Sequence, residues 1–304
     1  MTVTCEPFLS HERELPELRD RLQLRLEQLL PQLSEHDPVS AAMREGVLVP
    51  GKRIRPLLLL LAARDLGCDR AHPGLVDLAC AVELIHAASL IFDDMPCMDN
   101  ALERRGQPTI HHAYGQDVAI LAGIALLSRA FGVAATATGL SDACRNQVVA
   151  ELSIAVGIQG LALGQFKDLR ESSAPRSAVD IATTNDLKTS MLFGATLQLA
   201  ALAAGSSAAV REKLRSFAKD LGQAFQLLDY LSDRHVGTGK DCNKDAGKST
   251  MIAVIGADAV RQRLDGHLRS AEAHFTWACG EGHVTPRFMH AWFNQQLAIF
   301  SNDL

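Results

Sequence analysis

The chain has 304 residues, of which 47% are hydrophobic and 21% charged, the profile of a globular protein with a sizeable buried core. Its formal net charge is -5 and no basic region stands out, which argues against a nucleic-acid-binding protein. Seven cysteines without close spacing indicate neither a disulfide framework nor a zinc site, so we expect a cytoplasmic protein.

The first basic cluster follows an N-terminal segment, residues 1 to 40, which lacks the apolar core of a secretion signal and which we expect to be peripheral. Lys52, Arg53 and Arg55 then stand just before LLLLLAARDL, whose leucines and alanines favour a buried helix. Arginine binds phosphate oxygens through two parallel hydrogen bonds, and lysine acts as a mobile point charge. The cluster is therefore a candidate phosphate site, although each cation alone is more often an ordinary exposed residue.

Residues 75 to 94 form the first of two central predicted helices, which is apolar on almost every face until its end. That end carries Asp93 and Asp94, where carboxylates are unfavourable because the helix dipole already places negative charge there. Pro96 should break the helix, so that Asp99 turns back toward Asp93. The result would be an oxygen-rich pocket of the kind that Mg²⁺ prefers. A solvated acidic helix end is the alternative on this motif alone.

A stretch without charged residues lies between Lys188 and Arg211, and its composition raises the question of a membrane span. Thr196, Gln198 and Gly205 interrupt it, which leaves an apolar part shorter than the ~20 residues that a span requires. We expect a buried core helix followed by a Gly-Ser turn, and no membrane segment.

Residues 214 to 233 form the second central predicted helix, and it also ends in carboxylates. Asp229 and Asp233 lie four residues apart, and therefore on one face of the helix. This spacing is common on surface helices, but the preceding FQLL places it on an apolar one. A cation would offset the dipole cost at both acidic ends. Basic residues accompany these ends and indicate a site for two diphosphates bridged by metal: Arg104, Arg105, Lys188 and the lysines of the loop GTGKDCNKDAGKST.

Helix-period segments recur along the whole chain, separated by short turns rich in Gly, Pro and Ser. Strand-like alternation is rare, and no linker or repeat divides the chain. We therefore predict one all-α domain, residues 1–304, with about ten or more helices.

Seven motifs together resemble the trans-prenyl diphosphate synthases in order and spacing: GKRIRP, LIHAASLIFDDMPCMD, RRGQPT, GQFKDL, KTSMLFG, GQAFQLLD and GKDCNKDAGKST. The resemblance runs from Ala41 to the C-terminus and looks closest to the bacterial geranylgeranyl diphosphate synthases of carotenoid pathways. It implies a helical bundle of the isoprenoid synthase type around a central active-site cavity, and a homodimer. The implied reaction is Mg²⁺-dependent condensation of isopentenyl diphosphate with an allylic diphosphate.

The resemblance also implies roles for individual residues. The carboxylates that match the two metal-binding motifs, for about three Mg²⁺ ions per site, are Asp93, Asp94, Asp99, Asp229 and Asp233. The residues that match the isopentenyl diphosphate pocket are Lys52, Arg55, His86 and Arg105. Those that match the allylic diphosphate pocket are Arg104, Lys188, Thr189, Gln226 and Lys240.

Two positions depart from the family pattern. Tyr230 occupies the second position of the second acidic motif, which is normally Asp, and Asn100 replaces a frequent Asp beyond the first motif. Tyrosine is neutral and a weak magnesium ligand, so we expect reduced but retained activity with a higher Mg²⁺ requirement. A farnesyl diphosphate synthase, or a weakly active homologue that regulates an active synthase, are the alternatives. A terpene cyclase is less consistent with the sequence, because its second motif needs a Glu that DYLSDRHVG lacks.

Product length should depend on the depth of an apolar tunnel below Asp93 in this family. Ala88 and Ser89 precede Asp93 by about one helical turn, and both are small. A growing chain can pass them, which fits a twenty-carbon product better than a fifteen-carbon one. The alternative is that both are small only for helix packing.

Overall fold

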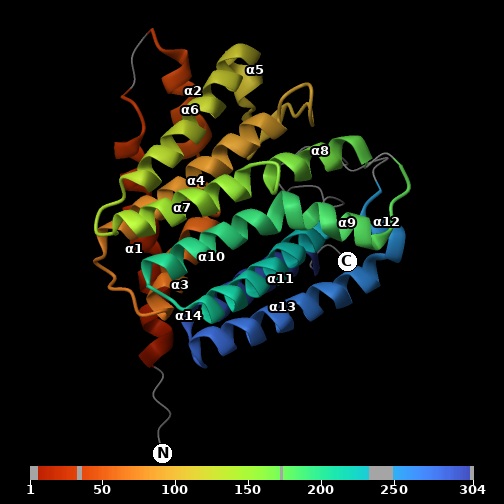
Figure 1. Cartoon of the computed structure of the whole chain (residues 1–304). Coiled ribbons are helices and arrows are strands. Elements are labelled where there is room, and N and C mark those ends of the chain that lie inside the picture. Colours follow the sequence, from red (N-terminus) through yellow and green to blue (C-terminus); the bar gives the residue numbers. More distant parts are fainter. Residues whose placement is uncertain (1–5, 33–35, 172–173, 233–248, 302–304) are drawn as a thin grey trace, which may run out of the picture.

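The computed structural model describes residues 6–32, 36–171, 174–232 and 249–301, which fold into an almost entirely helical molecule (Figure 1). In these ranges fourteen α-helices, one short π-helix and a two-residue antiparallel hairpin are present, which confirms the all-α prediction. The first elements are α1 (Glu6–Leu29), α2 (Pro38–Leu48), α3 (Ile54–Asp65), α4 (Pro73–Asp93), β1 (Glu103–Arg104), β2 (Gln107–Pro108), α5 (Ile110–Tyr114), α6 (Gln116–Ala135) and α7 (Asp142–Val156). The remaining elements are α8 (Leu161–Glu171), α9 (Ala178–Asn185), η1 (Asp186–Ser190), α10 (Met191–Ala203), α11 (Ala208–Ser232), α12 (Met251–Ile255), α13 (Ala257–Cys279) and α14 (Val284–Ser301).

Helix α4 is the interior helix of the fold, and it matches the predicted segment to within two residues. It packs against α1, α3, α6 and α10, so that side chains on nearly all its faces are buried. Pro73 suits the first turn, where a missing N–H leaves no hydrogen bond unmade. The helix ends at Asp93, with Asp94 as its C-cap. The chain therefore leaves the helical path just before Pro96. Packing against these helices thus fixes the position of α4, and with it the position of its acidic C-terminal end.

Helices α9, η1 and α10 follow one another without a break, and α11 returns beside them (Figure 1). The predicted uncharged core helix corresponds to α10, whose residues are mostly buried and which is followed by a turn at Gly205. Gly164 of α8 and Gly222 of α11 lie against η1. A Cβ atom at Gly164 would lie 2.5 Å from the backbone nitrogen of Lys188, and one at Gly222 would lie 2.3 Å from Oγ of Ser190. Only glycine permits these approaches, which enclose the turn that carries Lys188.

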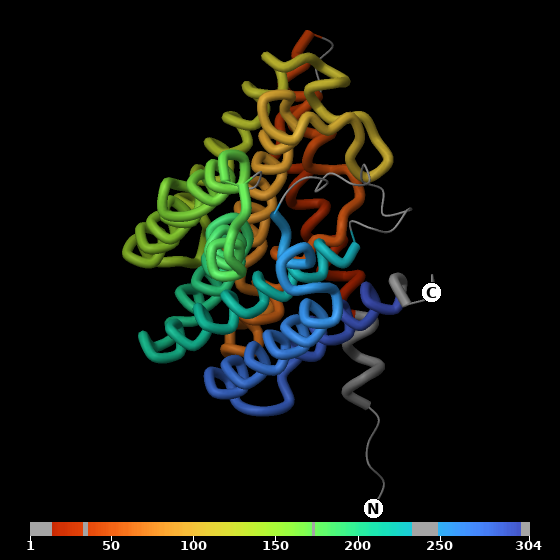
Figure 2. The backbone as a smooth tube through the Cα atoms, turned by 90° about the vertical axis from the view of Figure 1, so that its right-hand side faces the viewer, coloured from red at the N-terminus to blue at the C-terminus, as the bar shows by residue number. Residues whose placement is uncertain are grey.

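The C-terminal helices α13 and α14 lie at the end of the molecule opposite α5 and α6 (Figure 2). Within the N-terminal segment that we expected to be peripheral, Leu22 and Leu26 of α1 are fully buried in the core. Asp233 and Lys240, two of the predicted site residues, fall outside the described residues.

Three stretches are long and apolar enough to cross a membrane by length and composition alone: Pro73–Asp93, Gln116–Ala135 and Asp142–Glu171. Their apolar windows are 78%, 39% and 28% buried inside the molecule. The first is therefore a core helix, whereas α6 and the α7–α8 stretch keep apolar surface outside the fold. The absence of a membrane segment stays a prediction.

Candidate active site

The C-terminal end of α4 forms the acidic part of the site. The backbone N–H of Asp99 donates to the carbonyl of Asp93 at 2.9 Å, and that of Ala101 donates to the carbonyl of Asp94 at 3.1 Å. The segment after α4 is thus a compact turn that brings Asp99 back to the helix end. This is the turn that the position of Pro96 predicts.

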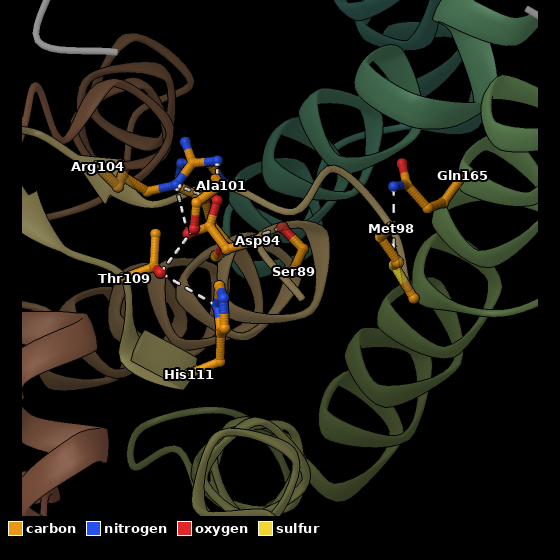
Figure 3. A network of polar contacts seen from close by, with 9 residues as sticks. Ser89, Asp94, Met98, Ala101, Arg104, Thr109, His111 and Gln165 are labelled. Atoms are coloured by element: carbon orange, nitrogen blue, oxygen red, sulfur yellow. Dashed lines mark hydrogen bonds and ion pairs between the residues drawn. The ribbon is translucent and has the colours of Figure 1, made fainter. Parts of the chain in front are cut away.

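Asp94 is buried and bound by Arg104 (Figure 3). Nε of Arg104 donates to both carboxylate oxygens at 3.0 and 2.8 Å, and Nη2 donates to Oδ1 at 2.6 Å. The expected metal ligand and the expected allylic diphosphate ligand are therefore bound to each other. A bidentate guanidinium–carboxylate pair is a strong, directional contact, and it fixes the hairpin of Arg104 to the end of α4.

Thr109 secures the other side of this hairpin. Its hydroxyl donates to the carbonyl of Ala101 at 2.8 Å and lies 3.1 Å from Nδ1 of His111, as Figure 3 shows. Its N–H donates to the carbonyl of Leu102 at 3.0 Å. These hydrogen bonds close the loop of residues 101–109, which carries Arg104.

Asp93 faces a half-buried lysine, Lys188. Burial raises the pKa of Asp93 to about 6. The negative charge of Asp99 also raises this pKa, whereas the positive charge of Lys188 lowers it. Lys188 donates to Oδ2 of Asp168 at 2.8 Å. Burial alone would lower the pKa of Lys188, but Asp93, Asp168 and Asp99 around it outweigh burial and hold that pKa above its usual value. Three carboxylates share one lysine here, an arrangement that a further cation would stabilise.

A basic group of side chains, Lys52, Arg55, His86 and Arg105, forms the second part of the site. Burial lowers the pKa of His86 well below its usual value, and the charges of Arg55 and Arg105 lower it further, so that the ring is neutral. Burial also lowers the pKa of Arg55 to about 10, and its Nε is buried without a hydrogen-bond partner among the described residues. Cations that lie this close together repel one another, so a bound anion would stabilise them.

Aromatic rings lie beneath the basic group. The guanidinium of Arg55 lies 4.4 Å from the ring centre of Phe193, and Nζ of Lys52 lies 5.1 Å from that of Trp292. Phe225 stacks on Trp292 with centroids 4.5 Å apart. Cations over aromatic faces are held by the ring quadrupole without losing their charge, so both remain able to bind an anion.

The second acidic motif lies at the end of α11, where Asp229 is exposed. The hydroxyl of Tyr230 donates to Oδ1 of the buried Asn185 at 2.9 Å. Asn185 directly precedes η1, so Tyr230 links the second motif to the turn of Lys188 and the buried Thr189. Gln226 lies half-buried on the same helix.

The two residues predicted to line a tunnel lie on α4 as expected, but their role stays a prediction. Ala88 is fully buried, and the hydroxyl of Ser89 donates to the carbonyl of His86 at 2.8 Å. Neither adds bulk at this level of the helix.

The donors at the acidic end suit a hard divalent cation. Among the described residues, no group of three or more His, Cys, Asp and Glu side chains is arranged to hold a metal ion. Asp93 and Asp99 nevertheless offer oxygens that repel each other at a buried helix end. Mg²⁺ keeps several waters and is usually held by one or two carboxylates together with substrate phosphates. The residues present therefore fit magnesium bound jointly with a phosphorylated ligand.

Three residues of the site were not identified from the sequence. Asp168 lies in the motif GQFKDL, which supported the resemblance but carried no assigned role. Glu83 pairs with Arg53 inside the protein, and Asn185 accepts the hydrogen bond of Tyr230. Asp168 could have been found from its motif, whereas the other two have no local signal.

Comparison with known proteins agrees with this geometry. The Polyprenyl synthetase family model matches residues 36–274. The chain is 56% identical to the geranylgeranyl diphosphate synthase of Pantoea ananas, covering 99% of this chain and 100% of that protein. It is also 56% identical to that of Pseudescherichia vulneris, over 96% and 95% of the two chains. A geranyltransferase of Helicobacter pylori, solved in complex with magnesium and isoprenyl diphosphate, superposes with a TM-score of 0.84 at 25% identity, covering 98% and 99%.

We predict that Arg104 is a structural anchor, which can be tested by unfolding. Arg104→Met should lower the free energy of unfolding by about 2–4 kcal/mol, because it leaves the buried carboxylate of Asp94 without its partner. Urea titration measures this loss. Arg261→Met, which removes an exposed pair with Asp258, is the control and should stay within about 0.5 kcal/mol. Equal effects of both substitutions would contradict the anchoring role.

Proposed function

The chain belongs to the polyprenyl synthetase family, and on this premise we propose that it is a Mg²⁺-dependent geranylgeranyl diphosphate synthase. It condenses isopentenyl diphosphate with an allylic diphosphate. The observation that carries the proposal is the division of the site into two parts. Carboxylates and Lys188 gather at the end of α4, and the basic group around the buried Nε of Arg55 lies beside them.

The basic part suits isopentenyl diphosphate. Lys52, Arg55 and Arg105 supply the positive charge, and His86, being neutral, can donate one hydrogen bond without adding to their repulsion. Burial of Arg55 over Phe193 strengthens its interaction with a diphosphate, because little water competes there. These side chains hold the five-carbon substrate so that its double bond meets the reacting carbon.

The acidic part suits the allylic diphosphate. Asp93, Asp99 and Asp229 are the carboxylates that would hold Mg²⁺, which supplies positive charge to stabilise the departing diphosphate. Lys188, fixed by Asp168, adds a positive charge from the protein. Asp94 acts through Arg104, which it orients. The number of ions, about three in this proposal, follows the family resemblance.

Once the allylic carbon is cationic, the surroundings decide its fate. The aromatic and aliphatic side chains around α4 and α10 exclude water, which would otherwise trap the cation. The double bond of isopentenyl diphosphate attacks the cation, and the new bond forms. Proton loss to the released diphosphate completes the step, so no side chain of the protein is required as the base.

The protein is proposed to act as a homodimer. Large apolar side chains are exposed along α6, α7, α8 and their connections: Ile120, Leu121, Ile124, Ile154, Ile158 and Phe166. These helices line one side of the molecule in Figure 2. A patch of this kind is a common mark of an interface, and a second copy of the chain would cover it.

A cytoplasmic location is consistent with the thiols. Cys68, Cys80, Cys97, Cys144 and Cys279 are all free, as expected for a reducing compartment. Burial raises the pKa of Cys279 to about 12, which makes that thiol unreactive.

A product assay tests the reaction. Purified protein with Mg²⁺, isopentenyl diphosphate and five-, ten- or fifteen-carbon allylic diphosphates should give a twenty-carbon diphosphate by mass spectrometry. Ala88→Phe should shorten the product, because the ring would block the proposed tunnel. A fifteen-carbon product from the unmodified protein would instead identify a farnesyl diphosphate synthase. No elongation at any Mg²⁺ concentration would contradict the proposed enzymatic activity and favour the interpretation as a regulatory homologue.

Replacing Tyr230 tests its effect on the metal requirement. Tyr230→Asp places a carboxylate beside Asp229 and should raise turnover or lower the Mg²⁺ concentration for half-maximal activity. The same change removes the hydrogen bond to Asn185, so Tyr230→Phe, which removes only the hydroxyl, is the matched control. Magnesium titrations of both variants separate the two effects. Identical titrations would show that the carboxylate contributes nothing.

The dimer can be tested by charge at its proposed interface. Leu121→Glu combined with Ile124→Glu should convert the protein to a monomer in sedimentation equilibrium, because burying two carboxylates without partners is unfavourable. Trp277→Glu, at an exposed aromatic residue of α13, should leave the dimer intact. A monomer before any substitution would contradict the proposal.

A further inference from the structure

We propose that Arg53, bound to Glu83, is a positioning residue: it fixes the loop of residues 49–55 so that Lys52 and Arg55 can hold isopentenyl diphosphate, which it does not itself contact. This inference rests on the proposed function. Arg53 lies between two expected substrate ligands, and in the sequence it is indistinguishable from them. In the structure its side chain does something different.

The backbone of Arg53 is in an uncommon conformation. Its φ is 50°, in the left-handed region that residues other than glycine rarely adopt. It stands at the residue before α3, yet its side chain does not cap that helix. Its carbonyl accepts the first hydrogen bond of α3, from the N–H of Leu57 at 3.1 Å. Such a conformation persists where surrounding contacts determine it, and the side chain supplies those contacts.

The guanidinium of Arg53 is buried and joins three parts of the chain. Nη1 donates to the carboxylate of Glu83, a buried residue of α4. Nη2 donates to the carbonyl of Val47 at 2.5 Å and to that of Val49 at 3.3 Å. These carbonyls belong to the last turn of α2 and the residue after it. One planar fork therefore ties the end of α2, the loop and α4 together, a geometry that lysine cannot reproduce.

The neighbours of Arg53 point to other elements. Lys52 reaches Trp292 and the side-chain oxygen of Gln296 on α14, and Arg55 lies over Phe193 on α10. The loop thus sends two cations toward the aromatic side of the site and one into the core. The core cation is neutralised by the carboxylate of Glu83, whereas Lys52 and Arg55 lie on the aromatic side of the site.

The same loop also accommodates Arg105. A Cβ atom at Gly51 would lie 2.6 Å from Nη1 of Arg105, so the loop passes close to this guanidinium. A shift of the loop would therefore disturb Lys52, Arg55 and Arg105 together. Residues of the acidic part lie at the end of α4, on the turn after it and on α8, η1 and α11, and would not be affected.

This separation gives the test. Arg53→Lys keeps the charge but loses the fork, and should raise KM for isopentenyl diphosphate about tenfold, the scale of losing hydrogen bonds made by a charged group. KM for the allylic diphosphate should stay within about twofold. Arg25→Lys is the matched control, because it alters the pair of Arg25 with Asp77 on the same α4 and does not touch the loop. An equal rise in both KM values, or none, would overturn the proposal.

A second variant separates position from stability. Arg53→Met combined with Glu83→Met removes the buried pair without leaving an unpaired charge, so the fold should be retained. Its KM for isopentenyl diphosphate should rise as in Arg53→Lys, while its melting temperature stays close to that of the unmodified protein. An unchanged KM in this variant would show that the pair does not position the loop.

Hydrogen exchange distinguishes failure of this inference from failure of the proposed function. Residues 49–55 should exchange about tenfold faster in Arg53→Lys, and residues of α6 should be unchanged, in the absence of any substrate. If the unmodified protein makes no product, the function fails and exchange still reports on the tether. If product forms but exchange in the loop is unchanged, the tether is wrong.

Discussion

Burial of carboxylates at the C-terminal end of an apolar helix is the constraint on which the rest of the structure depends. Asp93 and Asp94 end a helix whose dipole disfavours them, in surroundings where little water can solvate them. The protein answers with two different cations. Arg104 is bound to Asp94, and Lys188 faces Asp93 while also bound to Asp168. The negative charge of Asp94 is neutralised by Arg104, whereas the neighbouring carboxylates Asp93 and Asp99 attract a further cation.

In the basic part of the site, cations rather than carboxylates are crowded together. Arg53, Arg55 and Arg105 gather near His86, and Glu83 is the acid that binds one of them. Each part of the site therefore has an internal pair that joins it to α4: Asp94 with Arg104, and Glu83 with Arg53. Both pairs start from α4, so the acidic and the basic parts of the site are fixed relative to one helix.

Much of this organisation could be predicted from the sequence, and the exceptions have a physical reason. Helix periodicity and the position of Pro96 predicted α4 and the turn after it, because both depend on local chain geometry. The pairing of Asp94 with Arg104 could not be predicted, since a metal ligand and a salt-bridge carboxylate look alike in a sequence. The π-helix at Lys188 was also missed, because contacts from Gly164 and Gly222, distant in the chain, enclose it.

Tyr230 shows how far a motif determines chemistry. A tyrosine in place of aspartate removes a charge from the second acidic motif, and the sequence alone suggests simple loss. In the structure its hydroxyl reaches Asn185, one residue before the turn that carries Lys188. A carboxylate at this position, shorter and charged, would act on a cation, whereas the longer phenol binds the side chain of Asn185, three residues before the lysine. The substitution therefore exchanges a negative charge in the second acidic motif for a hydrogen bond that links α11 to the residue before the turn of Lys188.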